Sequence, residues 1–314
     1  MYIVTGGAGF IGSNLVRKLI DFTHEDIIVV DDLSDGKKYV NLSDLSIYDY
    51  LDQEEFLTMI REDKKFCSKI KCVFHQGACT DTTEWDGKYM MKNNFTYSKL
   101  LLHACLEKNI RFIYASSAAV YGASSNFKEQ QNNELPLNVY GYSKLLFDQY
   151  VRRLTLTKQQ QVVGLRYFNV YGPRESHKHS MASVIFHFNN QIQDNGAANL
   201  FKGSHGFSDG EQRRDFVFVD DICDVNLWFF KNSHLSGIYN VGTGSSSTFN
   251  QVAEAIINWH KKGKISYIDF PEKLMDTYQS STKANLESLR EAGYTKEFIN
   301  INDGIDRYLN YLAG

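Results

Sequence analysis

YIVTGGAGFIG, residues 2–12, is the segment from which the fold of this chain can be predicted. Tyr2–Thr5 is a short apolar run typical of a buried parallel strand, and the glycines follow it directly. Gly7, Gly9 and Gly12 have the spacing of a dinucleotide fingerprint, which needs a tight turn, close approach of the backbone to a pyrophosphate, and close helix–strand packing. The helix that begins here offers free N–H groups and the positive end of its dipole to phosphates.

Asp31 supports a dinucleotide site against the alternative of a glycine turn used only for packing. It ends a second apolar run, Ile27–Asp31, and stands 19 residues beyond Gly12, close to the spacing at which an acidic side chain binds a ribose hydroxyl. An acid at this position favours NAD, whereas Lys37 and Lys38 are suited to the 2′-phosphate of NADP. Residue types alone leave the choice between NAD and NADP open.

Strand and helix patterns alternate through the first half of the chain. Further apolar runs predict strands at Cys72–Phe74, Phe112–Ser116 and Val162–Phe168. Helical patterns lie between the predicted strands, near residues 10–22, 86–108 and 138–154. This alternation predicts an α/β fold with a Rossmann-like, doubly wound parallel sheet.

The alternation becomes irregular after Pro173. The patterns there predict helices near residues 181–194, 220–231, 249–261 and 303–312, and strands at Phe216–Val219 and Ile238–Val241. We expect a dinucleotide-binding domain formed by residues 1–170 plus about 215–242. A smaller, interleaved α/β substrate lobe is expected from about 171–214 plus 243–314.

Composition excludes several classes of protein. The 314 residues are 43% hydrophobic and carry a net charge of −3, without the basic surface of a nucleic-acid binder. No apolar run reaches the ~18 residues of a membrane span, and the N-terminus runs straight into the glycine turn, so we expect neither a membrane segment nor a signal peptide. The five cysteines are scattered and the nine histidines lack metal-ligand spacing. These features predict a cytoplasmic, metal-free protein that binds neither nucleic acid nor membrane.

Tyr140 and Lys144 stand four residues apart, on one face of a predicted helix. A phenol with a pKa of ~10 must lose about 3 units, or ~4 kcal/mol, to act as a base at neutral pH. An ammonium about 4 Å away supplies up to ~4 kcal/mol. We therefore expect Lys144 to lower the pKa of Tyr140 and make it a general base. Such pairs also occur by chance on exposed helices, but the upstream fingerprint favours a catalytic interpretation.

Two hydroxyls end the strand that precedes this helix. We expect Ser117 to hydrogen-bond the reacting oxygen and Ser116 to fix the end of the strand. The ordered set of the glycine turn, Ser-Ser-x-x-x-Tyr-Gly at 116–122, Tyr-x-x-x-Lys at 140–144 and RYFNVYGP at 166–173 resembles the extended short-chain dehydrogenase family of sugar-nucleotide enzymes. Dehydratases of that family carry an Asp-Glu pair where this chain has Ala118 and Ala119, so the resemblance implies epimerisation.

Further segments resemble one group of that family, the ADP-L-glycero-D-manno-heptose 6-epimerases. These segments are residues 82–91, 173–183, 214–217 and 259–263. The resemblance implies oxidation of ADP-D-glycero-D-manno-heptose at C6 to a 6-keto intermediate and its reduction to the L-glycero epimer, for lipopolysaccharide core biosynthesis. It also makes Lys178 a second acid/base facing Tyr140, although a loop lysine is ordinarily a solvated surface residue. Relatives are homo-oligomers, commonly pentamers.

Matching positions imply the remaining contacts. The catalytic set is Tyr140, Lys178, Lys144 and Ser117. The implied cofactor contacts are Gly6, Gly9, Phe10, Ile11, Gly12, Asp31, Asp32, Lys38, Gln53, Gln76, Gly77, Ala78, Cys79, Thr80, Asn93, Lys144, Val170 and Lys178. The implied substrate contacts are Asn169, Ser180, His187, Phe201, Lys202, Gly203, Ser204, Arg214 and Tyr278.

The group generally uses NADP, in agreement with Lys38, and NAD is the alternative. Two other functions compete with this interpretation. One is C4 epimerisation of a UDP-hexose, with Tyr140 alone transferring the proton, and the other is a dinucleotide-binding scaffold without catalysis. The intact Tyr140, Lys144 and Ser117 argue against the scaffold.

Overall fold

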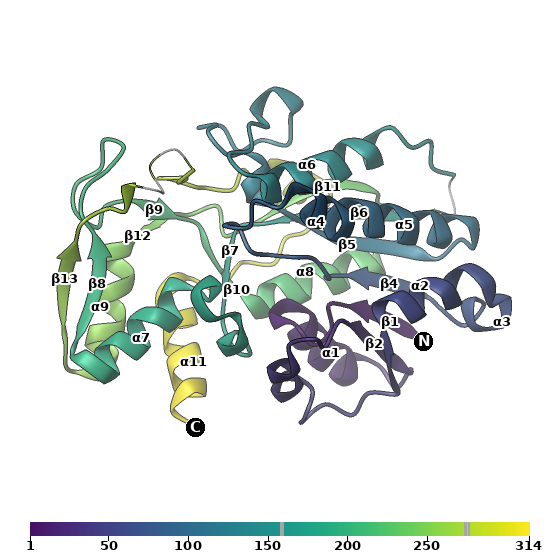
Figure 1. Cartoon of the computed structure of the whole chain (residues 1–314), viewed down its shortest axis with the longest axis horizontal. Helices are drawn as coiled ribbons and strands as arrows, with labels where there is room; N and C mark the ends of the chain where they lie inside the picture. The colour runs from purple at the N-terminus through teal and green to yellow at the C-terminus, as the bar shows by residue number, and fades with distance from the viewer. Residues whose placement is uncertain (158–159, 273–274, 276) are drawn as a thin grey trace.

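A seven-stranded, entirely parallel sheet forms the centre of the computed structural model, which describes residues 1–157, 160–272, 275 and 277–314 (Figure 1). Its strand order is β11–β6–β5–β4–β1–β2–β3. The strands are β1 (Tyr2–Thr5), β2 (Ile27–Asp31), β3 (Asp49–Asp52), β4 (Cys72–His75), β5 (Arg111–Ser117), β6 (Val162–Tyr167) and β11 (Gly237–Val241). Because all strands run the same way, their carboxyl ends meet at one edge, where parallel α/β sheets bind ligands.

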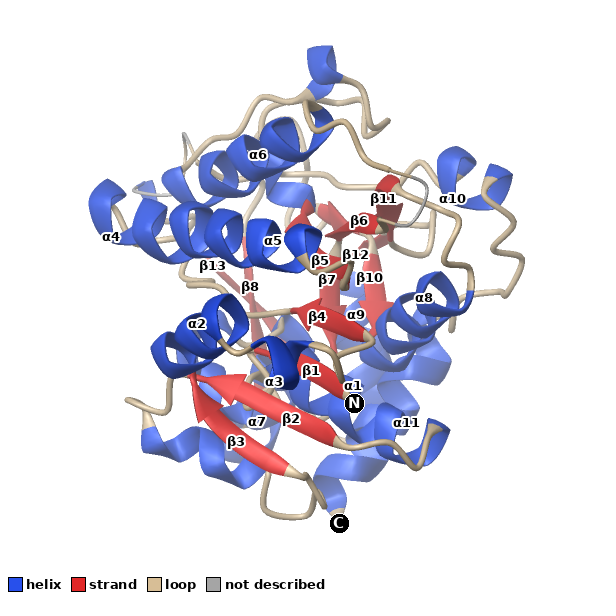
Figure 2. Cartoon of the chain, turned by 90° about the vertical axis from the view of Figure 1, so that its right-hand side faces the viewer, coloured by secondary structure: helices blue, strands red, loops and turns tan. Residues whose placement is uncertain are grey.

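Helices cover both faces of this sheet (Figure 2). α1 (Phe10–Phe22) and α8 (Val219–Lys231) pack on one face. α2 (Gln53–Glu62), α5 (Tyr97–Glu107) and α6 (Val139–Arg152) pack on the other. Side chains of β1 alternate between the two faces, since Val4 belongs to the first core and Ile3 to the second. This explains why its residues form an uninterrupted apolar run.

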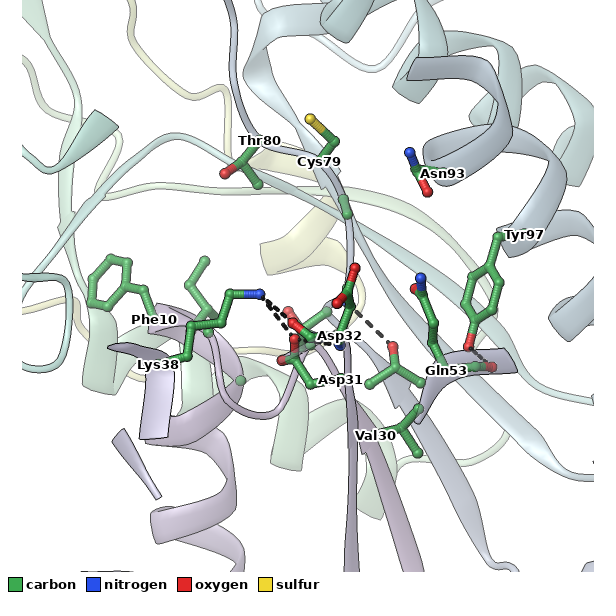
Figure 3. A pocket seen from close by; sticks show the side chains of 18 of the residues that line it. Phe10, Val30, Asp31, Asp32, Lys38, Gln53, Cys79, Thr80, Asn93 and Tyr97 are labelled. Carbon is green, nitrogen blue, oxygen red and sulfur yellow. Dashed lines mark hydrogen bonds and ion pairs between the residues drawn. The ribbon is translucent and has the colours of Figure 1, made fainter. Parts of the chain in front are cut away.

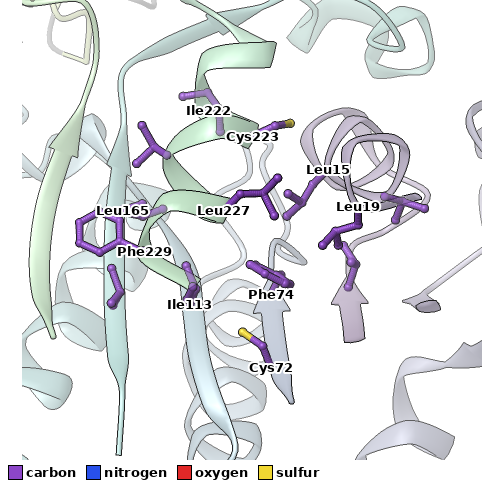
Figure 4. Close-up of a cluster of buried hydrophobic side chains, with 14 of the residues drawn as sticks. Leu15, Leu19, Cys72, Phe74, Ile113, Leu165, Ile222, Cys223, Leu227 and Phe229 are labelled. Carbon is purple, nitrogen blue, oxygen red and sulfur yellow. The ribbon is translucent and has the colours of Figure 1, made fainter. Parts of the chain in front are cut away.

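The first core is built from residues far apart in the sequence (Figure 4). Leu15 and Leu19 of α1 and Leu227 of α8 meet Phe74 and Leu165 of the sheet, and all of them are buried. Burial of one such side chain stabilises the fold by about 1.5–3 kcal/mol. The core therefore holds the N-terminus of α1 at the carboxyl edge of β1.

A smaller lobe gathers residues beyond position 168, at the left of Figure 1. Its strands form three pairs: β7 (Asn169–Tyr171) with β10 (Phe216–Phe218), β9 (Arg213–Arg214) with β12 (Ser247–Thr248), and β8 (Ala197–Phe201) with β13 (Lys264–Ile268). Its helices are η5 (Ser176–Met181), α7 (Val184–Asn195), α9 (Phe249–His260) and α11 (Ile301–Ala313). α7, α9 and α11 share one apolar core.

The remaining helices are short. They are η1 (Gly36–Asn41), α3 (Lys64–Cys67), α4 (Gly87–Met91), the π-helical turn η2 (Lys92–Thr96), η3 (Ala118–Val120), η4 (Gln131–Asn133) and α10 (Glu287–Glu291). No helix in the described ranges is long and apolar enough to cross a membrane.

The predicted fold class is confirmed: a Rossmann-like doubly wound sheet with a smaller α/β lobe. The domain boundaries near residues 170, 215 and 242 stay a prediction. Strand β3 was not predicted, because it lies at the sheet edge and buries only Leu51, so no apolar run marks it. The single helix predicted over residues 86–108 is divided by the π-helical turn η2.

Candidate active site

The turn between β1 and α1 is shaped for a phosphate group. A Cβ at Gly12 would lie 2.0 Å from the carbonyl oxygen of Gly6, so only glycine allows α1 to approach the turn this closely. Gly9 is the N-cap of α1; no side chain caps the helix, and no acidic residue lies in its first turn. The free N–H groups and the helix dipole therefore suit the pyrophosphate of a dinucleotide.

Replacement of Gly12 by Ala is expected to weaken dinucleotide binding by about 1–3 kcal/mol, tenfold or more, because the methyl group forces α1 away from the turn. Gly36→Ala is the matched control, since a Cβ there meets nothing within 4 Å. Titration of each variant with NADPH by fluorescence measures the effect. Wild-type affinity in the Gly12 variant would contradict this role of the turn.

A cavity of about 300 Å³ opens beside this turn, at the carboxyl edge of the sheet (Figure 3). All the residues predicted to contact the cofactor line it, except Lys144 and Val170. The cavity also contains residues that sequence reasoning did not assign, namely Thr5, Val30, Ser34, Tyr89, Tyr97 and His177. Tyr89 and Tyr97 stand four residues before and after Asn93, and this helical spacing is the signal that could have identified them.

Asp31 and Lys38 contact each other in the lining of the cavity (Figure 3). Asp31 Oδ2 accepts a hydrogen bond from the Ala8 amide at 2.8 Å, and Oδ1 accepts one from Lys38 Nζ at 3.0 Å. Lys38 Nζ also donates to the Asp32 carbonyl oxygen at 2.9 Å. Lys37 is exposed and does not line the cavity, so of these two lysines only Lys38 belongs to the cavity lining.

Tyr140 lies at the start of α6, next to the end of β5. The Asn138 side chain caps this helix by accepting a hydrogen bond from the Gly141 amide at 2.8 Å. A Cβ at Gly141 would lie 2.7 Å from the carbonyl oxygen of Ala119, so α6 packs directly on the turn that follows Ser117. Burial raises the pKa of the Tyr140 phenol, and hydrogen bonding with Ser117 opposes that rise.

The predicted lowering of the Tyr140 pKa by Lys144 is wrong for this structure. Lys144 Nζ donates a hydrogen bond to the carbonyl oxygen of Ala115 at 3.0 Å. Burial lowers the pKa of Lys144 to about 8, so the cation is itself weakened. Sequence spacing placed the two residues on one face of the helix, but burial has the larger effect on each pKa.

Lys144 is expected to make the stability of the dinucleotide-free protein depend on alkaline pH. Its folded pKa of about 8 lies below the ordinary ~10.4, so in this window the unfolded chain binds more protons than the folded one. The penalty for burying the ammonium is complete below pH ~8 and is relieved as pH rises to ~10.4, by about 3 kcal/mol. Urea unfolding of wild type and Lys144→Met should diverge across this window, and parallel curves would contradict the prediction.

Asn94 joins the start of α6 to the wall of the cavity. Its Oδ1 accepts a hydrogen bond from the Cys79 amide at 2.8 Å, and its Nδ2 donates to Ser143 Oγ at 3.1 Å. Ser143 Oγ in turn donates to the Tyr140 carbonyl oxygen at 2.7 Å. Tyr140 thus lies beside the cavity rather than in its lining, and Cys79, which lines it, is half-buried.

Ser116 and Ser117 point to different partners. Ser116 Oγ donates a hydrogen bond to Asp148 Oδ2 at 2.8 Å and is buried, which agrees with its predicted role at the strand end. Ser117 Oγ accepts one from the Ala119 amide at 3.1 Å and is half-buried. Ser117 is therefore the hydroxyl that stays close to Tyr140.

Lys178 lies in η5 and lines the same cavity as the glycine turn. Its ammonium lies over the Phe10 ring, 5.5 Å from the centroid. Burial lowers the pKa of Lys178, and the carboxylate of Glu175 opposes that effect. This direction is the one expected for a lysine that exchanges protons near neutral pH.

Three of the predicted substrate residues come together in the smaller lobe. The Arg214 guanidinium lies 4.7 Å from the Tyr278 ring centroid and 5.6 Å from that of Phe249. Tyr278 and Phe201 both pack against Phe270, with centroids 5.1 and 5.3 Å apart. Arg214 is buried, and this burial lowers its pKa. These residues form the Arg214 group, which consists of Arg214, Tyr278, Phe249, Phe270 and Phe201. The Arg214 group offers aromatic faces and a positive charge to a ligand.

The other predicted substrate residues are spread more widely. Ser204 Oγ accepts a hydrogen bond from Gln212 Nε2 at 3.1 Å, next to the exposed Gly203. Lys202 forms an exposed ion pair with Asp269, outside the Arg214 group. The implied contacts Asn169, Ser180 and His187 lie in β7, η5 and α7, and Val170 lies in β7 beside Val217.

Comparison with known proteins adds the final observation. The family model described as "NAD dependent epimerase/dehydratase family" matches residues 2–242. Helicobacter pylori ADP-L-glycero-D-manno-heptose-6-epimerase is 30% identical, over 99% of this chain and 96% of that one, with a TM-score of 0.85.

Two UDP-sugar epimerases are nearly as similar. Methanobrevibacter ruminantium UDP-N-acetylglucosamine 4-epimerase is 27% identical over 99% of this chain and 98% of its own, with a TM-score of 0.81. Thermus thermophilus UDP-glucose 4-epimerase is 25% identical over 100% and 99%, also with a TM-score of 0.81.

Proposed function

This chain belongs to the NAD dependent epimerase/dehydratase family, and we propose that it epimerises a nucleotide sugar, ADP-D-glycero-D-manno-heptose, at C6 of the heptose. The observation that carries the proposal is the placement of Lys178, a partly buried lysine in the cavity of the glycine turn. With Tyr140 beside that cavity, the site has two groups able to exchange a proton. A reaction that inverts a carbinol carbon can use one proton-exchanging group on each side of the sugar.

The residues present suit a bound dinucleotide. The uncapped N-terminus of α1 would hold the pyrophosphate, and Asp31 with Lys38 would meet the adenosine ribose and its 2′-phosphate. Lys38 supports NADP as the cofactor, with NAD as the alternative. The chemistry that the bound dinucleotide supplies is reversible acceptance of hydride from the sugar carbon.

The protein's own residues divide the proton transfers. In this proposal Tyr140 takes the proton from the sugar hydroxyl in one configuration. Lys178 donates a proton to the same oxygen after the exocyclic carbon has rotated and the carbonyl is reduced. Ser117 hydrogen-bonds the reacting oxygen in this proposal, and Lys144 supplies a positive charge one helical turn after Tyr140 on the same face of α6. The Arg214 group would anchor the nucleotide end of the substrate while the reacting carbon turns.

Related proposals rest on the same resemblance. We assign the reaction to lipopolysaccharide core biosynthesis in the cytoplasm and expect a homo-oligomer, with a pentamer as the first candidate. A second function, C4 epimerisation of a UDP-hexose, is supported by the 25–27% identity to UDP-sugar 4-epimerases. C4 epimerisation needs no second acid/base besides Tyr140. The presence of Lys178 in the cavity therefore favours the C6 reaction.

Turnover measurements separate the two functions. The purified protein is expected to convert ADP-D-glycero-D-manno-heptose to its L-glycero epimer and to leave UDP-glucose unchanged, as followed by NMR of the sugar protons. Mass spectrometry of the nucleotide that co-purifies decides between NADP and NAD. Conversion of UDP-glucose alone would replace the heptose assignment with C4 epimerisation.

A further inference from the structure

The loop that carries Lys178 is held in place by side chains that lie outside it. Lys178 belongs to η5, a short 3-10 helix that gives its backbone little regular support. Two non-glycine residues of this loop have left-handed backbone: Arg174 with φ of 73° and His179 with φ of 48°. Such conformations cost about 1–3 kcal/mol each and persist only where tertiary contacts enforce them.

Asn41 joins the loop to the glycine turn. Its Nδ2 donates a hydrogen bond to the Ala8 carbonyl oxygen at 3.0 Å and lies 3.0 Å from His177 Nδ1. The second contact is a hydrogen bond when the imidazole carries its proton on Nε2. Burial, then the neighbouring lysines Lys178 and Lys38, lower the pKa of His177, which favours the neutral ring that accepts this bond.

Two further contacts hold the same segment. Arg174 Nη1 donates to the Asn41 carbonyl oxygen at 2.6 Å, and Asn14 Nδ2 donates to the Pro173 carbonyl oxygen at 2.8 Å. At the base of the loop, the buried Glu175 accepts hydrogen bonds from the Ser183 amide at 2.5 Å and from Ser183 Oγ at 2.7 Å. The loop is thus anchored on both sides of Lys178.

The Asn41 side chain contacts both the glycine turn and the residue next to Lys178. The Lys178 ammonium lies over the face of the Phe10 ring, 5.5 Å from the centroid, and this contact alone does not fix the loop that carries Lys178. We propose that Asn41 is a positioning residue, which sets the distance between Lys178 and the dinucleotide turn through His177. The catalytic part of this inference rests on the proposed function, whereas the positional part does not.

The variant Asn41→Ala tests the positional part. The rate of acetylation of Lys178 by an amine-reactive reagent, read by peptide mass spectrometry on the dinucleotide-loaded protein, is expected to rise severalfold as the ammonium leaves its half-buried place. Ser43→Ala is the matched control, because Ser43 is exposed in the same segment and its hydroxyl bonds only the Val40 carbonyl oxygen among the described residues. An unchanged labelling rate in Asn41→Ala would overturn the proposal, whether or not the protein acts on heptose.

A double-mutant cycle tests the catalytic part. Asn41→Ala alone is expected to lower kcat about tenfold or more with KM little changed, since a misplacement of ~1 Å can cost up to 100-fold. In a Lys178→Met background it should add almost nothing, because it acts through Lys178. An equal loss in both backgrounds would show a general structural effect and refute the assignment. If Asn41→Ala is too unstable to assay, His177→Ala removes the other end of the bridge and leaves the Asn41–Ala8 bond.

Discussion

Tyr140→Phe combined with Lys178→Met is expected to abolish epimerisation, with a loss of at least about 10⁴-fold. Each single variant should retain measurable activity, because one proton-exchanging group remains at the site. General acid–base groups contribute about 10²–10⁴-fold each, which sets the size of the single losses. The comparison of all four proteins therefore tests whether two groups act.

The double variant should keep its fold and its dinucleotide. Phe keeps the ring of Tyr140 in its half-buried place, and Met keeps an unbranched apolar chain over Phe10. Tyr142→Phe is the matched control, because Tyr142 lies on the same helix and is 48% exposed. Turnover with ADP-D-glycero-D-manno-heptose and the content of bound nucleotide are measured together. A wild-type rate in the double variant would refute the two-group mechanism, and loss of the nucleotide would show that the variant fails for another reason.

Arg166→Met is expected to destabilise the protein by about 3–5 kcal/mol, the cost of breaking a buried ion pair. Arg166 is fully buried on β6. Its Nε donates to Asp148 Oδ2 at 2.9 Å, and its Nη2 donates to Glu134 Oε1 at 2.5 Å. Removal of the guanidinium takes away the ion-pair partner of Asp148, whose other hydrogen-bond donors in the described structure are the neutral hydroxyls of Tyr114 and Ser116.

Urea unfolding measures this loss. Arg153→Met is the control, since Arg153 is exposed at the end of the same helix as Asp148 and should change stability by less than about 0.5 kcal/mol. The further change Asp148→Asn in the Arg166→Met background is expected to recover part of the loss, because it removes the uncompensated charge. If Arg166→Met had the same free energy of unfolding as the control, the ion pair would contribute no more to stability than apolar packing does.

This buried network also bears on the active site. Asp148 stands one helical turn after Lys144 and two turns after Tyr140, on the same face of α6. Asp148 opposes the burial that lowers the pKa of Lys144. The ion pair with Arg166 therefore joins α6 to β6 of the sheet, and the Asp148 carboxylate supports the charge of Lys144.

The resemblance to a family implied most of the cavity lining, whereas the local sequence pattern was enough to predict six strands of the sheet and the glycine turn. These features depend on local requirements: apolar runs for strands covered on both faces, and glycines where a Cβ would meet the backbone, as at Gly12. The tyrosine–lysine spacing is local in the same way, because a helix places Tyr140 and Lys144 on one face.

The tertiary structure decided the features that depend on residues far apart in the chain. Burial, not spacing, sets the direction of the pKa shifts of Tyr140 and Lys144. Asn41 and His177, 136 positions apart, meet only because the loop after β7 folds back onto the glycine turn. Desolvation and long-range hydrogen bonds arise from packing, so they have no signature in a short stretch of sequence.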